Sequence, residues 1–188
     1  CSVLYVEQRG QNNSSGEYMG FGLTERFDCL DWLNWEIERC GSDIPVYLAG
    51  VSMGATTVLM AAGLQLPPNV HGIMADCGFT SANAIWEHIA KDNLHIRFGI
   101  RSAIADRMCR RKIQVGSKEH STVEALKHTH VPVILVHGAD DHFVPVEMTY
   151  ENYTACTAPK DLLIVPGADH GMSYFMEPEK YENAVKAF

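Results

Sequence analysis

A serine within a glycine-flanked pentapeptide is the first feature of this sequence that could carry chemistry. Gly50-Val51-Ser52-Met53-Gly54 matches the pattern G-x-S-x-G, in which the serine occupies a tight, strained turn between a strand and a helix. Small residues on both sides let such a turn close, and the N–H of Met53 at the helix start can stabilise an oxyanion. The pattern arises by chance in roughly one chain of this length in twenty, so its placement decides its meaning.

An acid and a histidine nearer the C-terminus could complete the chemistry of that serine. Asp141 lies in VHGADDHFVP and His170 in VPGADHGMS, each shortly after an apolar stretch. A histidine with the ordinary pKa of about 6.5 can take the serine proton and return it to a leaving group. An acid can fix the tautomer of that histidine. Asp140 is the nearest rival to Asp141, and Asp76 is a less favoured one.

The elements that must position these residues are apolar strands alternating with helices. A helix with Thr24 as its N-cap is predicted to end at Gly41, and a buried, alanine-rich helix is predicted over 55–64. Continuously apolar strands between helices predict an α/β fold with a mostly parallel sheet covered on both faces. The predicted strands are 2–6, 44–49, 70–75, 131–136 and 162–165.

The order of the three candidates along the chain matters as much as their types. Ser52, Asp141 and His170 each follow a predicted strand, and the carboxyl ends of parallel strands meet at one edge of a sheet. The order Ser, Asp, His is that of the α/β-hydrolases and differs from the orders of the two other well-known serine protease folds. We therefore expect the three side chains to converge as a catalytic triad.

The stretch 81–130, between the third and fourth apolar strands, is too long for a plain crossover. It predicts a crossover helix with a small helical cap over the site, and Phe79 and Val144 are candidates for lining a substrate pocket beneath it. The stretch also carries a basic cluster. A solvated helix face is favoured there over a site for an anionic substrate. The cluster consists of Arg107, Arg110, Arg111 and Lys112.

Composition bounds the remaining possibilities. The 188 residues, 46% hydrophobic and 20% charged, predict one soluble, folded domain over 1–188. A formal charge of −8 and a pI near 5.5 argue against nucleic acid or an anionic membrane surface as the main partner. No apolar stretch is long enough to span a bilayer. The six cysteines lack zinc-type spacing, which predicts free thiols, a cytoplasmic location, and no metal or cofactor.

Taken together, these motifs resemble the α/β-hydrolase family, and within it a bacterial group of esterase- and lipase-like serine hydrolases. The resemblance runs from end to end and implies that Ser52, Asp141 and His170 form the triad. It is carried by YVEQRG at 5–10, GFGLTERFDCLDWL at 20–33, GVSMGATTVLMA at 50–61, ADCGFTS at 75–81, VHGADDHFVP at 136–145 and GADHG at 167–171.

Two departures from the family pattern accompany the resemblance. Members usually show D-x-R-G-x-G-x-S after the strand predicted at 2–6, where this sequence has Glu7-Gln8-Arg9-Gly10-Gln11-Asn12. Members also carry about a further third of the domain upstream. That part includes the strand whose following loop gives the second oxyanion donor, and which lies between the strands predicted at 2–6 and 44–49. We therefore expect this sequence to begin part-way through the domain.

The function predicted from these observations is hydrolysis of a small ester or related acyl compound through an acyl-enzyme. A peptidase or a thioesterase is an alternative, because the same triad serves esters, thioesters and amides. A binding protein that keeps the fold without turnover is a second alternative, motivated by the altered loop at Gln11-Asn12 and by the single oxyanion donor.

Overall fold

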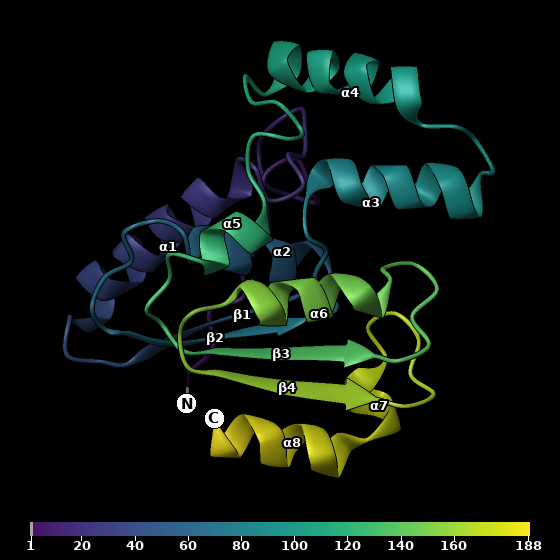
Figure 1. The fold of residues 1–188 in the computed structure, drawn as a ribbon. Coiled ribbons are helices and arrows are strands. Elements are labelled where there is room, and N and C mark those ends of the chain that lie inside the picture. The colour runs from purple at the N-terminus through teal and green to yellow at the C-terminus, as the bar shows by residue number, and fades with distance from the viewer. Residues whose placement is uncertain (1) are drawn as a thin grey trace.

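A four-stranded parallel sheet forms the centre of the protein. The computed structural model describes residues 2–188, apart from the side chain of Asn93. The strands β1 (Val46–Val51), β2 (Val70–Asp76), β3 (Val133–Gly138) and β4 (Lys160–Val165) lie side by side in that order. Because all strands run in parallel, their carboxyl ends share one edge, on the right in Figure 1. Both the α/β class and the parallel sheet predicted from sequence are confirmed.

Helices cover the two faces of this sheet. Helix α2 packs against β1 and β2, α6 packs against β3, and α8 lies on the opposite face (Figure 1). The main core lies between α2 and the sheet, where Leu59, Ile73 and Leu135 are almost fully buried. The helices are α1 (Glu25–Cys40), α2 (Met53–Ala61), α3 (Ala82–His88), the π-helix η1 (Ile89–Asn93), α4 (Gly99–Lys112), α5 (Thr122–Leu126), α6 (Val146–Ala155), α7 (Ser173–Met176) and α8 (Pro178–Ala187).

The strand predicted at 2–6 is not formed. The side chains of Val3 and Tyr5 are 81% and 91% exposed, and no strand of the described chain pairs with this segment. A β-branched, aromatic run becomes a strand only when a neighbour accepts its backbone hydrogen bonds. No strand among residues 2–188 accepts those bonds, so the prediction of a buried strand was wrong here.

Prolines set the starts of two strands slightly later than predicted. The strand predicted at 44–49 begins after Pro45, and the one predicted at 131–136 begins after Pro132. Proline has no N–H to donate to a ladder, so it stands at the first residue of a strand or outside it. Both strands also continue two residues further than predicted, which places His137 and Gly138 inside β3.

Both ends of α1 lie where the sequence predicts them, with Thr24 as the N-cap and Gly41 after the last helical residue. Gly41 ends the helix with a φ of 96°, and its N–H donates to the carbonyl of Ile37. Thr24 precedes the helix but makes no side-chain cap bond; its hydroxyl contacts the buried carboxylate of Glu25. That carboxylate accepts the N–H groups of Gly20 and Gly22, so Glu25 holds the loop that enters the helix.

The stretch 81–130 contains α3, η1, α4 and α5, and α4 stands well away from the sheet (Figure 1). Two members of the basic cluster have partners within the chain. Arg110 pairs with Asp106 and Glu119, and the ammonium of Lys112 donates to the hydroxyl of Tyr18. These contacts favour a solvated helix face. No helix in the described part of the chain is long and apolar enough to cross a membrane.

Candidate active site

Ser52 occupies a strained turn between β1 and α2. Its φ of 54° and ψ of −117° lie in a region that residues with a side chain rarely adopt. Its N–H donates to the carbonyl of Asp76 at the end of β2, 2.8 Å away, which holds the strained backbone in place. The turn therefore presents the hydroxyl at the carboxyl edge of the sheet, as the G-x-S-x-G pattern predicts.

The two glycines of the motif differ in what they contribute to this turn. A Cβ on Gly50 would lie 2.2 Å from the carbonyl carbon of Gly54, so only glycine allows the end of β1 to approach α2 so closely. A Cβ on Gly54 meets no atom within 4 Å in the described structure. The expectation that both small residues are needed to close the turn therefore holds for Gly50 alone.

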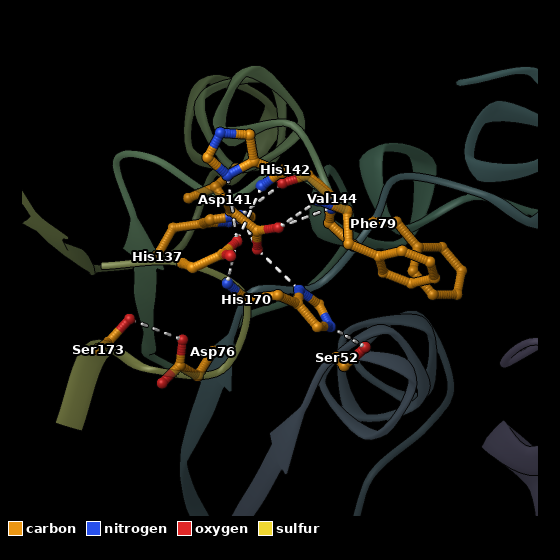
Figure 2. A network of polar contacts seen from close by, with 12 residues as sticks. Ser52, Asp76, Phe79, His137, Asp141, His142, Val144, His170 and Ser173 are labelled. Atoms are coloured by element: carbon orange, nitrogen blue, oxygen red, sulfur yellow. Dashed lines mark hydrogen bonds and ion pairs between the residues drawn. The ribbon is translucent and has the colours of Figure 1, made fainter. Parts of the chain in front are cut away.

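The three predicted residues form one hydrogen-bonded line (Figure 2). The hydroxyl oxygen of Ser52 lies 2.8 Å from Nε2 of His170, and Nδ1 of His170 lies 2.7 Å from Oδ2 of Asp141. If Nδ1 carries the proton that it shares with Asp141, Nε2 is left with a lone pair that accepts the serine proton. With this geometry the three side chains could act as nucleophile, base and orienting acid.

The carboxylate of Asp141 is buried and fully hydrogen-bonded. Besides His170, its Oδ2 contacts Nε2 of His137 at 3.1 Å, and its Oδ1 accepts the N–H groups of Phe143 and Val144, both at 2.8 Å. Burial raises the pKa of Asp141, but the hydrogen bonds from the two histidines and the backbone outweigh it and hold the pKa well below its ordinary value. This carboxylate is therefore ionised at neutral pH, whereas the adjacent Asp140 is exposed.

His137 supports the acid, a role that the sequence analysis did not assign. This histidine is completely buried, and its Nε2 lies 3.1 Å from Asp141 and 2.9 Å from the carbonyl of Val144. Because both are acceptors, Nε2 carries the proton, and Nδ1 accepts the hydroxyl of Thr149 at 2.6 Å. A histidine inside a fully buried strand, four residues before the acid, was the signal that could have revealed it.

His170 is partly exposed to solvent, unlike the carboxylate of Asp141. Its side chain is 25% exposed, and the ring of Phe143 stands edge-on with centroids 5.1 Å apart. The hydrogen bond to Asp141 and the neighbouring thiol of Cys77 raise the pKa of His170 to about 10, against the opposing effect of burial. The ring therefore holds a proton more firmly than a free imidazole does.

Asp76, the less favoured rival acid, lies on the other side of the site (Figure 2). Its carboxylate accepts the hydroxyl of Ser173 at 3.3 Å. Burial raises the pKa of Asp76, and hydrogen bonds from Tyr181 and Ser173 oppose this. Asp76 thus ties the start of α7, three residues beyond His170, to the end of β2 and occupies a supporting position.

The remaining predicted site residues lie around the serine. Met53 is the first residue of α2, where backbone N–H groups have no intrahelical acceptor and can bind an anion. Phe79 is 3% exposed and Val144 is fully buried; both belong to one apolar cluster against which Met53 packs. Both side chains are buried in this structure, and their contact with substrate stays a prediction.

Comparison with known protein sequences finds relatives that are themselves uncharacterized proteins. No family model matches the chain. It is 25% identical over 187 residues to the uncharacterized protein YqkD of Bacillus subtilis, covering 100% of this chain and 61% of that protein. It is 22% identical over 189 residues to the uncharacterized protein Rv2307c of Mycobacterium tuberculosis, covering 59% of that protein. The chain therefore spans about three-fifths of the length of the curated relatives it matches.

Comparison with solved structures identifies the fold. An esterase of Pyrococcus furiosus, Pf2001, superposes with a TM-score of 0.72 at 17% identity, covering 96% of this chain and 67% of that one. A lipase-esterase related protein of Clostridium acetobutylicum gives 0.66 at 16% identity over 95% and 80%. An acylaminoacyl peptidase of Pyrococcus horikoshii gives 0.70 at 16% identity over 96% and 30%. The chain has the α/β-hydrolase fold.

Proposed function

We propose that the protein is a serine hydrolase that cleaves a small ester or related acyl compound through an acyl-enzyme. The observation that carries this proposal is the line from Ser52 through His170 to the buried Asp141, with spacings of 2.8 and 2.7 Å, at the carboxyl edge of an α/β-hydrolase sheet. The strained backbone of Ser52 supports it further, because such strain persists where function requires a particular geometry.

In the first half-reaction, Nε2 of His170 takes the proton of Ser52 as the serine oxygen attacks the substrate carbonyl carbon. The carbonyl oxygen becomes an oxyanion, which the N–H of Met53 at the start of α2 stabilises. His170 then gives the proton to the departing alcohol, leaving an ester of Ser52. Asp141 stays ionised throughout and stabilises the positive charge on His170.

In the second half-reaction, water takes the place of the serine hydroxyl. His170 removes a proton from water, the hydroxide formed attacks the acyl carbon, and the same proton returns to Ser52 as the acid leaves. A thioester or an amide can follow the same path with a different leaving group. The likeness to an acylaminoacyl peptidase keeps amide hydrolysis as the second candidate.

A fluorophosphonate probe tests the nucleophile, because it phosphonylates only an activated serine. We expect the full-length protein to be labelled and the Ser52→Ala variant to be unlabelled. Ser42→Ala, which removes an exposed hydroxyl outside the site, is the matched control and should be labelled like the parent protein. Equal labelling of Ser52→Ala would show that the nucleophile is another residue. No labelling of the parent protein would overturn the proposal and favour a binding function.

A substrate panel separates the ester from the thioester and amide candidates. p-Nitrophenyl esters of increasing acyl length, acyl-CoA thioesters and aminoacyl amides are compared by kcat/KM in the full-length protein, with Ser52→Ala as the blank. We expect the highest kcat/KM with short acyl esters. A preference for amides over every ester would assign the peptidase candidate instead.

A further inference from the structure

Cys77 places a buried thiol beside the proposed triad. It is the first residue after β2, its side chain has no exposed surface, and its φ is 49°. Its N–H donates to the carbonyl of Val136 at 2.9 Å, which fixes the residue between the ends of β2 and β3. Nothing in the hydrolytic steps above uses this thiol.

The thiol belongs to a cluster with two members of the triad. One potential ligand atom from each of Cys77, Asp141 and His170 lies within 4.8 Å of the other two. Around a tetrahedral Zn²⁺, with bonds of about 2.0 to 2.3 Å, ligand atoms stand roughly 3.3 to 3.8 Å apart. The three side chains could therefore close on one ion with movements of about an ångström.

We propose that Cys77, Asp141 and His170 form an inhibitory site for a thiophilic divalent cation, with Zn²⁺ as the best-fitting ion. Thiolate, imidazole and carboxylate are the ligand types that Zn²⁺ takes in proteins, and a thiolate selects against Mg²⁺ and Ca²⁺. Binding releases the thiol proton to solvent. The sequence showed no zinc-type spacing because the three ligands come from the ends of three different strands.

Metal binding would remove the base from the reaction whichever ring nitrogen it uses. A cation on Nε2 occupies the lone pair that accepts the proton of Ser52. A cation on Nδ1 takes the place of the proton shared with Asp141, so that the ring's remaining proton sits on Nε2, which then cannot act as acceptor. The ion can approach from the solvent side of His170, whose side chain is 25% exposed.

Direct binding tests the site without relying on turnover. Full-length protein freed of metal with a chelator is titrated with ZnCl₂ by calorimetry, and with CoCl₂ while the thiolate-to-cobalt charge-transfer absorption is recorded. We expect one Zn²⁺ per chain, a Kd at least about tenfold weaker in Cys77→Ser, and the absorption band in the parent protein only. Cys156→Ser, which changes another buried thiol far along the chain, should bind as the parent does.

The inhibitory consequence rests on the proposed hydrolase function and has its own measurement. Hydrolysis of a p-nitrophenyl ester is followed against ZnCl₂, each variant normalised to its own metal-free rate. We expect half-inhibition near the calorimetric Kd, reversal by chelator, and resistance in Cys77→Ser. Inhibition and binding unchanged in Cys77→Ser would overturn the site, as would a cobalt complex of the parent protein without thiolate absorption.

The two proposals can fail separately. A protein without esterase activity but with Cys77-dependent Zn²⁺ binding would contradict the hydrolase function and support the metal site. Full activity at saturating Zn²⁺ would contradict inhibition even where binding occurs. Should Cys77→Ser fail to fold, the charge-transfer absorption of the parent protein alone decides whether the thiol is a ligand.

Discussion

Among single residues, the proposed reaction depends most on Asp141, which orients His170 and stabilises its positive charge. Two adjacent aspartates follow β3, and only the second is buried and bonded to the histidine. Replacing Asp141 by Asn leaves the shape of the side chain but removes the charge that stabilises the imidazolium. We expect Asp141→Asn to lower kcat by roughly 10⁴-fold, and Asp140→Asn to stay within about threefold of the parent rate. Steady-state ester hydrolysis measures both; equal losses would show that the acid is misassigned.

The raised pKa of His170 gives a prediction about pH. A base must be unprotonated to accept the serine proton, so the rising limb of kcat/KM follows the histidine pKa of the free enzyme. Because the contacts with Asp141 and Cys77 raise that pKa to about 10, we expect the limb to lie above 6.5, in the alkaline range. In Asp141→Asn the limb should move towards lower pH. A limb at or below pH 6.5 in the parent protein would contradict the argument.

Among the elements, the turn between β1 and α2 has room for a side chain at one glycine of the motif but not at the other. Gly50→Ala forces a Cβ into the backbone of Gly54, whereas Gly54→Ala meets open space in the described structure. We expect Gly50→Ala to lose at least about 3 kcal/mol of stability or to abolish activity. Gly54→Ala should change the free energy of unfolding by no more than about 1 kcal/mol. Urea unfolding measures the free energy of unfolding of the two variants, and ester hydrolysis measures their activity.

The central strand β3 and the exposed segment before α4 offer a second comparison between elements. Leu135 is 1% exposed in β3, and Leu94 is 60% exposed after η1. Leu135→Ala should cost about 2 to 5 kcal/mol because it removes buried contacts and leaves a cavity, whereas Leu94→Ala should stay within about 0.5 kcal/mol. Unfolding midpoints in urea at unchanged m-value would check this. Similar losses in the two variants would mean that the core is misplaced.

For the molecule as a whole, the sequence predicted the parallel sheet. It also predicted that the loops carrying Ser52, Asp141 and His170 lie together at the carboxyl edge of that sheet. The apolar runs were recognisable as strands of a parallel sheet. In the structure β3 is buried throughout, whereas β1 alternates between half-buried and exposed residues. The convergence of Ser52, Asp141 and His170 followed from parallel strands sharing one carboxyl edge. These inferences needed only local pattern and topology.

What the sequence could not predict depended on contacts that only the folded chain reveals. Residues 2–6 have the composition of a strand but no partner in the described chain, and strand formation requires one. His137 follows the strand predicted at 131–136, yet it lies buried inside β3, where it supports Asp141. Cys77 was one of six cysteines predicted to be free thiols, and only the folded chain brings its thiol beside His170 and Asp141. The surroundings of residues 2–6 and of Cys77 are set by segments distant in sequence, whereas His137 supports an acid only four residues away, after a strand that continues further than predicted.

The most direct test of the central claim is to trap the acyl-enzyme and locate it. Full-length protein is mixed with a slowly deacylating p-nitrophenyl ester, quenched in acid, and analysed by intact-mass and peptide mass spectrometry. We expect one acyl group per chain, carried by the peptide that contains Ser52 and missing from Ser52→Ala. An acyl group on any other residue, or hydrolysis of the ester at the parent rate by Ser52→Ala, would contradict the claim.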